Sequence, residues 1–393
     1  MIQALALPLL ASGMLAADRE PCPTAEDWLA RRLEWFQDLR FGFFSHWGPY
    51  SQWGCIESWP LVEVDRWARP DDLPAWVERG RDLERFRRDY WALPRTFNPV
   101  KFDPRKWVAA AKTAGMRYFV FTTKHHDGFS MYDTRLTDYR ITHPDCPFSR
   151  DPRADVTRLL FDAFREEGFG IGAYFSKADW HHPDYWSPDA PARDRNPNYD
   201  PLKNPEKWGR FVRFVHGQVE ELMTRYGRID ILWLDAGQVR PPKQDLRMDE
   251  LAAMARRHQP ELLLLNVGGQ PDGELPEEAV RRLREIGEWM KVNGEAIYAT
   301  RPVAPYKEGR VALTRRGGIV HAIYLAEEGR EAPPAEIALP SLRPRAGSKV
   351  TLLGSGLEIP WRQEGEKGMV LEVPEAAIQA PPCRHAWVFR FEG

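Results

Sequence analysis

The sequence has few cysteines, almost no net charge and no long apolar run beyond its amino terminus, and each absence argues against a class of protein. The four cysteines lie far apart and form no C-x-x-C pair, so neither a zinc ribbon nor a disulfide scaffold is indicated. A net charge of −2 leaves no basic surplus to neutralise a nucleic-acid backbone or to dock on an anionic membrane. No segment reaches the roughly 18 apolar residues of a membrane span. We therefore expect neither a nucleic-acid partner nor a membrane span.

The amino-terminal stretch, residues 1–17, is almost entirely apolar. Leu15-Ala16-Ala17 before Asp18 resembles the small-residue cleavage site of a signal peptide, although no Lys or Arg precedes the apolar stretch. The sequence therefore predicts a signal peptide over residues 1–17 and a secreted or periplasmic protein.

Aromatic side chains are abundant, with 16 Trp, 12 Tyr and 19 Phe. Carbohydrate sites use such rings, because the C–H faces of a sugar stack on an aromatic face while its hydroxyls need polar partners. A large core rich in indoles would give the same composition. Composition alone leaves both interpretations open.

From residue 28 onward, helical patterns alternate with short apolar runs. Helices are predicted over residues 28–39, 107–114, 154–167 and 205–226, and strands over residues 41–47, 116–122, 169–175 and 229–234. A long loop rich in Trp and Pro follows the first strand. Continuous apolar strands alternating with helices predict a parallel sheet covered on both faces. A (β/α)8 barrel is favoured among α/β folds, because no glycine-rich phosphate loop follows any strand.

The pattern changes after Pro302 to short segments separated by Gly and Pro turns. Strands are predicted over residues 310–315, 319–325, 336–339, 349–353, 369–373 and 386–391. These segments predict a small antiparallel β-sandwich. The expected domains are thus a (β/α)8-like catalytic domain over residues 18–302 and a C-terminal β-sandwich domain over residues 303–393.

Polar residues follow the predicted parallel strands at the point where each ends. The strands end in Ser45-His46-Trp47, in Lys124-His125-His126-Asp127, in Tyr174-Phe175-Ser176 and in Asp235. Function gathers at the carboxyl ends of the strands in a parallel barrel, so these groups are expected on one rim.

The chemistry of these groups suits a sugar. Asp235 is either a helix N-cap or a carboxylate nucleophile that forms a covalent glycosyl intermediate. The histidines can donate or accept hydrogen bonds to sugar hydroxyls. A metal site on His125 and His126 is disfavoured, because neighbours on an extended chain point in opposite directions. We expect neither a metal nor a cofactor.

Five segments of the chain form a more specific pattern. They are Phe41–Gly48 (FGFFSHWG), Thr123–Phe129 (TKHHDGF), Ile231–Asp235 (ILWLD), Asn266–Gly268 with Asp272-Gly273, and Asn293–Tyr298 (NGEAIY). In this order, and over most of the chain, they resemble the signatures of glycoside hydrolase family 29, the α-L-fucosidases. The resemblance implies a (β/α)8-like catalytic domain, a C-terminal β-sandwich and retaining hydrolysis of terminal α-L-fucose from fucosylated oligosaccharides or glycoconjugates.

The same resemblance assigns individual residues. It places the nucleophile on Asp235. It places fucose-binding groups on His46, His125, His126 and Tyr174. The family also supplies a Trp and often a Glu from the loop after the first strand, for which Glu57 and Trp59 are the best matches here. A packed loop without a role in binding is the alternative for these two.

The chain departs from the family pattern in the second half of the barrel. Two strands that the family separates by several tens of residues are fused here within residues 259–268, and only five strands are found before Pro302 where a closed barrel needs eight. The missing stretch is where the family usually carries its general acid/base, so that residue is unassigned. Glu57, Glu261 and Asp272 are the carboxyls to consider. Smaller departures are Ala236 where the family has Gly and Gly269 where it has Pro.

Three functions remain open at this point. The first is a retaining α-L-fucosidase, slowed on poor leaving groups by the missing acid/base. The second is a fucose-binding pseudoenzyme that keeps the pocket without turnover. The third is a (β/α)8 glycosidase for another sugar. The sequence leaves the oligomeric state, the linkage preference and the role of the C-terminal domain undetermined.

Overall fold

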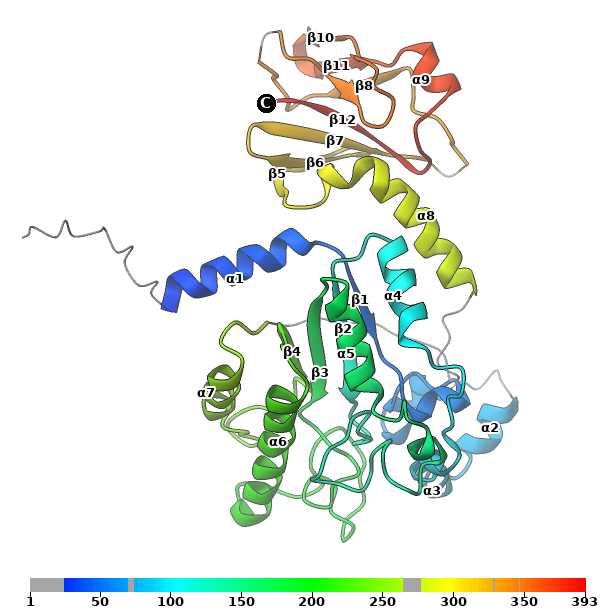
Figure 1. Ribbon diagram of the computed structural model, residues 1–393, viewed down its shortest axis with the longest axis vertical. Helices are drawn as coiled ribbons and strands as arrows, with labels where there is room; N and C mark the ends of the chain where they lie inside the picture. Colours follow the sequence, from blue (N-terminus) through cyan, green and yellow to red (C-terminus); the bar gives the residue numbers. More distant parts are fainter. Residues whose placement is uncertain (1–24, 70–73, 264–276, 328, 346) are drawn as a thin grey trace, which may run out of the picture.

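The computed structural model describes residues 25–69, 74–263, 277–327, 329–345 and 347–393, and its centre is a parallel sheet (Figure 1). Its strands are β1 Gly42–Ser45, β2 Tyr118–Lys124, β3 Gly170–Ser176 and β4 Ile231–Asp235, paired in the order β1-β2-β3-β4. Each strand lies on one of the apolar runs, because a strand buried on both faces needs apolar residues throughout. The predicted parallel sheet is confirmed.

The sheet stops short of a closed barrel in the described part of the chain. Leu263 forms a parallel bridge to Ile231 of β4, and its N–H donates to the carbonyl of Asp230. Within the described residues, the parallel sheet thus consists of four strands and one bridged residue, whereas a closed barrel has eight strands. Residues 264–276, which include the motif residues 266–268 and 272–273, lie outside the described residues. The arrangement agrees with the expected incomplete (β/α)8-like barrel.

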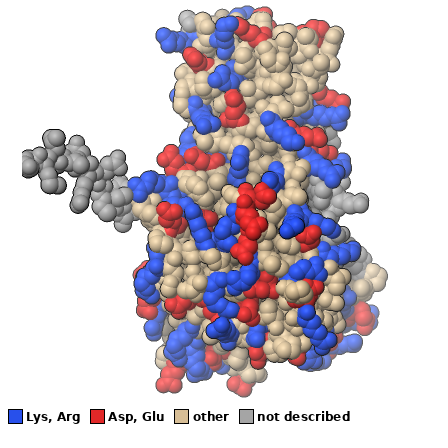
Figure 2. All heavy atoms as spheres, in the orientation of Figure 1, with Lys and Arg blue, Asp and Glu red and all other residues tan. Residues whose placement is uncertain are grey.

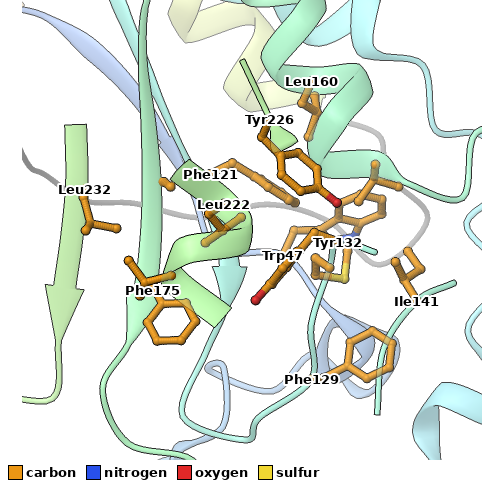
Figure 3. Packing of buried hydrophobic residues seen from close by; sticks show 14 of the residues in the cluster. Trp47, Phe121, Phe129, Tyr132, Ile141, Leu160, Phe175, Leu222, Tyr226 and Leu232 are labelled. Atoms are coloured by element: carbon orange, nitrogen blue, oxygen red, sulfur yellow. The ribbon is translucent and has the colours of Figure 1, made fainter. Parts of the chain in front are cut away.

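Three helices cover the outer face of the sheet. They are α4 Pro104–Thr113, α5 Val156–Glu166 and α6 Pro205–Arg225, and the first two begin at Asp103 and Asp155, whose side chains accept backbone N–H groups of the first turn. Phe119 of β2 stacks on Phe164 of α5 with ring centroids 3.9 Å apart. Figure 3 shows Leu160 of α5 and Leu222 of α6 in the same core as Phe121 and Phe175.

The inner face of the sheet carries the alternate side chains of each strand. Phe44, Val120, Tyr174 and Ile231 form a separate buried cluster there, and Trp233 packs against it. The ring of Phe44 lies 5.7 Å from that of Tyr174 and 5.4 Å from that of Trp233. Successive side chains of a strand point to opposite faces of the sheet. Half of each apolar run therefore packs under the helices, and the other half lines the inner face of the sheet.

Some helices were not predicted. The long loop after β1 contains α2 Pro74–Gly80 and α3 Leu83–Trp91, and after β4 come α7 Met248–His258 and α8 Glu277–Asn293. Charged residues outnumber apolar ones in several of their turns, so the apolar periodicity is weak. Their stability comes from packing against the barrel rather than from sequence pattern.

The first helix, α1 Ala25–Leu39, lies across the amino ends of the strands. Arg32 of this helix forms a buried ion pair with Asp230, which immediately precedes β4, at 3.2 Å. Phe36 packs against Tyr118 at the start of β2 with ring centroids 5.6 Å apart. The helix therefore covers the end of the sheet opposite to the polar rim.

The carboxyl-terminal region contains two antiparallel sheets. One has the order β5-β6-β7-β12-β9 and the other β10-β11-β8. The bounds are β5 Arg301–Glu308, β6 Val311–Arg316, β7 Ile319–Leu325, β8 Glu336–Leu339, β9 Thr351–Leu352, β10 Trp361–Glu364, β11 Gly368–Glu372 and β12 Ala386–Glu392, with a short helix α9 Glu375–Gln379. Both sheets contribute to one buried core, in which Leu339 and Leu371 meet Trp387 and Phe389. This is the predicted β-sandwich, and β5 and β10 are strands that were not predicted.

Helix α8 connects this sandwich to the first βα unit of the barrel (Figure 1). Gly287 of α8 approaches α4 so closely that a Cβ atom there would lie 1.6 Å from the carbonyl oxygen of Thr113. The hydroxyl of Tyr298 donates to the carbonyl of Gly115, and the indole of Trp289 donates to the carbonyl of Ala386 at 2.8 Å. Close packing thus anchors the C-terminal region beside α4.

Charges of both signs alternate over the face of the molecule drawn in Figure 2. This mixture agrees with the net charge of −2. Among the described helices, none is long and apolar enough to cross a membrane.

Candidate active site

The carboxyl ends of the four strands bring the predicted polar residues together. The ring of His46, after β1, lies 5.2 Å from that of His125 and 4.7 Å from that of Tyr174. His125 and Tyr174 stack with centroids 5.7 Å apart. The Nε2 atom of His126 lies 3.8 Å from a carboxylate oxygen of Asp235. These five side chains therefore form one continuous surface on the rim of the sheet.

Asp235 is the last residue of β4 and is oriented by two donors. The hydroxyl of Tyr174 donates to Oδ2 at 2.8 Å, and the backbone N–H of Ala236 donates to Oδ1 at 2.6 Å. The Asp235 side chain is 36% exposed, whereas Tyr174 is fully buried. The carboxylate is therefore held in place while one side of it stays accessible to a ligand.

The residue after Asp235 explains one departure from the family pattern. Ala236 has a φ of +71°, in the left-handed region that glycine occupies without steric cost. The turn is required to aim the N–H of Ala236 back at the carboxylate. A glycine is favoured at this position for this reason, and the backbone of Ala236 is strained in this chain.

His125 and His126 are neutral at physiological pH. Burial, followed by the neighbouring rings of His126 and His46, lowers the pKa of His125 well below its usual range. Burial also lowers the pKa of His126 to about 4, against the opposing effect of Asp235. Neutral imidazoles offer one donor and one acceptor each, which suits the hydroxyls of a sugar.

Glu57 and Trp59 lie in the loop after β1, next to the rim. Burial raises the pKa of Glu57, a hydrogen bond from the Trp59 side chain opposes this, and the charge of Asp235 raises it further. Glu57 has a φ of +49°, so the loop holds it in a conformation that is uncommon for a non-glycine residue. Glu57 is therefore a carboxyl close enough to Asp235 to respond to its charge.

Trp59 closes the other side of the rim. Its ring lies 4.9 Å from that of His126, and the guanidinium of Arg195 lies 4.4 Å from its centroid. Arg195 is in turn fixed by a bidentate ion pair with Asp65, at 2.7 and 2.9 Å. Arg195 lies in a long irregular segment, where no local sequence pattern marks it as part of the site.

A buried polar network supports the end of β2. The Lys124 ammonium donates to Asp179 at 3.2 Å and to Gln218 at 3.0 Å, and burial lowers its pKa. Tyr90 donates to Asp127 at 2.9 Å, and burial raises the pKa of Asp127 to about 7. These contacts fix the end of the strand that carries His125 and His126.

Of the two other carboxyls considered from the sequence, Glu261 is described and lies away from this rim. Glu261 lies 3.6 Å from Arg32 and 3.7 Å from Arg228, beside Asp230 at the amino end of β4, which is the opposite end from Asp235. Asp272 lies outside the described residues. Glu261 is thus excluded as a partner of Asp235 by its place in the fold. Within the described ranges, no group of three or more His, Cys, Asp or Glu side chains is arranged to hold a metal.

A carboxylate at the carboxyl end of a parallel strand, beside neutral imidazoles, a second carboxyl and an indole, is typical of a glycoside hydrolase with a (β/α)8-like domain. The family described as "Alpha-L-fucosidase" matches residues 10–262 and 261–295, and "Alpha-L-fucosidase C-terminal domain" matches residues 318–392. The chain belongs to the α-L-fucosidase family, glycoside hydrolase family 29.

Individual relatives agree with this assignment. The tissue α-L-fucosidase of Homo sapiens is 25% identical over 437 residues, which cover 91% of this chain and 89% of the human one. The structure of α-L-fucosidase isoenzyme 1 from Paenibacillus thiaminolyticus has a TM-score of 0.70 at 28% identity, covering 93% of this chain and 99% of that one. The Thermotoga maritima α-fucosidase in complex with a mechanism-based inhibitor shares the fold, with a TM-score of 0.71 at 22% identity, 95% coverage of this chain and 100% of its own.

The comparisons also locate the shortened part of the chain. The alignment with the human relative is 437 positions long, more than the 393 residues of this chain, so the relative carries residues that this chain lacks. The two matches to the catalytic family meet at residues 261–262. This is where the sequence pattern indicated that two strands are fused.

Proposed function

We propose that this protein hydrolyses terminal α-L-fucose from fucosylated glycans with retention of configuration, through a covalent intermediate on Asp235. The observation that carries the proposal is the position of the Asp235 carboxylate at the rim, held by Tyr174 and the N–H of Ala236 beside two neutral histidines. Membership of the α-L-fucosidase family supports the choice of sugar.

The first step forms a bond between Asp235 and the anomeric carbon and breaks the bond to the leaving oxygen. The hydrogen bonds to both Asp235 oxygens orient the carboxylate for this attack. Splitting one displacement into two lowers the barrier of each. Water then attacks the anomeric carbon, releases Asp235 and yields fucose with its original configuration.

The leaving oxygen needs a proton, and we propose Glu57 as its donor. Burial and the charge of Asp235 raise the pKa of Glu57, which favours the protonated form that a general acid needs. In the second step the same carboxylate takes a proton from the attacking water. The family usually draws this group from the stretch that is missing here, so Glu57 would serve in its place.

The remaining rim residues bind the sugar. His46 and the neutral His125 and His126 exchange hydrogen bonds with its hydroxyls, and Tyr174 keeps its proton because burial and Asp235 raise its pKa well above the usual range. The Trp59 ring offers an apolar face for the C–H groups of the sugar. Binding by these groups requires neither a cofactor nor a metal.

Turnover of an aryl α-L-fucoside, compared with the Asp235→Asn variant, tests this function. We expect phenolate release by the wild-type protein and its loss in the variant, with aryl galactosides turned over far more slowly. A folded wild-type protein that binds fucose without releasing phenolate would support the pseudoenzyme instead. Preference for a galactoside would indicate a glycosidase for another sugar.

We also propose that the chain is exported. The apolar residues 1–17 and the Leu15-Ala16-Ala17 sequence support a signal peptide. Cleavage after Ala17 would leave a mature protein that begins at Asp18. Amino-terminal sequencing of the protein recovered outside the cytoplasm checks this, and an intact Met1 on the active protein would contradict it.

A further inference from the structure

Each histidine of the rim contacts a side-chain hydroxyl through its Nδ1 atom. The pairs are His46 with Thr122 at 2.6 Å, His125 with Ser58 at 2.5 Å and His126 with Ser176 at 2.6 Å. The three hydroxyls come from β2, from the loop after β1 and from the end of β3, and all three are buried. One arrangement is therefore repeated on three separate elements, and its effect depends on which partner supplies the proton.

The proton can be assigned for His126. Ser176 Oγ carries a single proton, which it donates to the carbonyl of Ala178 at 2.7 Å. A carbonyl can only accept, so the hydroxyl has no proton left for the imidazole and must accept one from it. The proton of neutral His126 therefore resides on Nδ1, and Nε2 carries a lone pair. Thr122 stands in the same relation to His46, because its hydroxyl donates to the carbonyl of Ser45 at 2.8 Å.

The tautomer matters because Nε2 of His126 lies 3.8 Å from Oδ2 of Asp235. With the proton on Nδ1, His126 gives the carboxylate no N–H donor, and Asp235 keeps the donors Tyr174 and Ala236. With the proton on Nε2, the ring would donate toward the nucleophile, which would stabilise the carboxylate before attack. It would also remove an acceptor for a sugar hydroxyl.

We propose that Ser176 is a positioning residue that acts through His126, holding this ring in the Nδ1–H form so that Nε2 accepts a hydrogen bond from a sugar hydroxyl beside Asp235. The inference rests on the proposed function for the identity of the sugar. The tautomer itself is a property of the free protein and can be measured without substrate.

The test compares Ser176→Ala with Ser176→Thr, which keeps a hydroxyl. We expect Ser176→Ala to lower kcat/KM for an aryl α-L-fucoside about 10- to 100-fold, and Ser176→Thr to retain most of it. In a His126→Asn background, Ser176→Ala should cause little further loss, because the residue it acts through is gone. An equal loss in both backgrounds would overturn the proposal.

A spectroscopic measurement separates this role from simple packing. Nitrogen-15 spectra of protein labelled at histidine report which ring nitrogen carries the proton, and the His126→Asn variant identifies the signal of His126. We expect a protonated Nδ1 in the wild-type protein and a shift of the proton toward Nε2 in Ser176→Ala. A wild-type His126 protonated at Nε2 overturns the inference. Loss of the proposed function would instead appear as a wild-type protein with the expected tautomer and no turnover.

Discussion

Strands β3 and β4 lie side by side in the parallel sheet but differ in burial and in pairing. Every residue of β3 is buried, whereas the last three residues of β4 are partly exposed. β3 pairs with a full strand on each side, while beyond β4 the described structure has a single bridged residue, Leu263. His125, His126 and Tyr174, which would bind the sugar, thus rest on the inner strands β2 and β3, whereas Asp235, the proposed nucleophile, lies on the edge strand β4. Most of the proposed sugar-binding groups therefore lie on strands that are paired on both sides, whereas the proposed nucleophile lies on a strand with little pairing on its outer side.

The largest effect should come from removing the carboxylate on the edge strand. We expect Asp235→Ala to lower kcat for an aryl α-L-fucoside about 10⁴-fold or more, because the proposed covalent intermediate forms on this carboxylate. The free energy of unfolding should change by less than about 1 kcal/mol, because the side chain is partly exposed. Steady-state kinetics and urea denaturation measure the two quantities.

A small external nucleophile provides the control for this variant. Azide can enter the space left by the Asp235 carboxylate and should restore turnover of an activated fucoside with a fucosyl azide as product. Unfolding of Asp235→Ala under conditions where the wild-type protein is stable would show that β4 depends on this residue for its structure. Asp235 would then have a structural role as well as a chemical one.

The second effect concerns the leaving group. We expect Glu57→Gln to slow hydrolysis of unactivated α-L-fucosides about 10²- to 10⁴-fold, since these need a proton on the departing oxygen. Substrates with an activated phenolate leaving group should be affected far less. Rates measured for a series of leaving groups of different acidity test this. An equal loss across the series would mean that Glu57 binds the sugar and that the acid lies elsewhere.

The third effect is on stability and arises from Asp127, which is buried beyond the end of β2. Burial raises the pKa of Asp127 from 3.8 to about 7, so the folded state keeps a proton that the unfolded state loses above about pH 4. The stability contributed by this proton is present below pH 4 and is lost as the pH rises through 7. We expect Asp127→Asn to gain up to about 4 kcal/mol over the wild-type protein between pH 4 and 8. Urea denaturation across this range measures the difference.

An exposed carboxylate supplies the comparison for that measurement. The side chain of Asp145 is 68% exposed, so Asp145→Asn should leave the pH dependence of unfolding close to that of the wild-type protein. A pH dependence of Asp127→Asn that follows the wild-type curve would contradict the raised pKa of Asp127.

The smallest expected effect is on stability and concerns Ala236, directly after the edge strand β4. Ala236 adopts a φ of +71°, and we expect Ala236→Gly to stabilise the protein by about 1 kcal/mol by relieving this strain, with activity retained. Ala109→Gly, at an exposed position of α4, should instead destabilise by about 1 kcal/mol. Thermal unfolding of both variants provides the measurement, and destabilisation by Ala236→Gly would show that the turn is not strained.

The sequence predicts the buried parts of this fold better than the exposed ones. Strands β1 to β4 are found because burial on both faces requires apolar residues throughout, which leaves a visible run. β5 and β10 were missed because much of each strand is exposed and carries polar residues or proline. The helices after β1 were missed for a related reason, since packing rather than periodicity stabilises them.

The site follows the same division. The polar residues at strand ends can be predicted because parallel strands end on one rim, so the sequence alone places His46, His125, His126 and Asp235 together. The contacts that fix their orientation were not accessible. Ser176 reaches His126 from a neighbouring strand, and Arg195 reaches Trp59 from a distant loop. Such contacts depend on tertiary packing and leave no local pattern.

The packing of α8 on α4 determines where the length of this chain can vary. Gly287 meets Thr113, and Tyr298 meets Gly115, so the segment that leads into the sandwich is packed against the beginning of the barrel. The two catalytic family matches meet at residues 261–262, between these fixed points. A segment from a longer relative could therefore be inserted at this junction, to extend the sheet beyond β4, without disturbing either attachment.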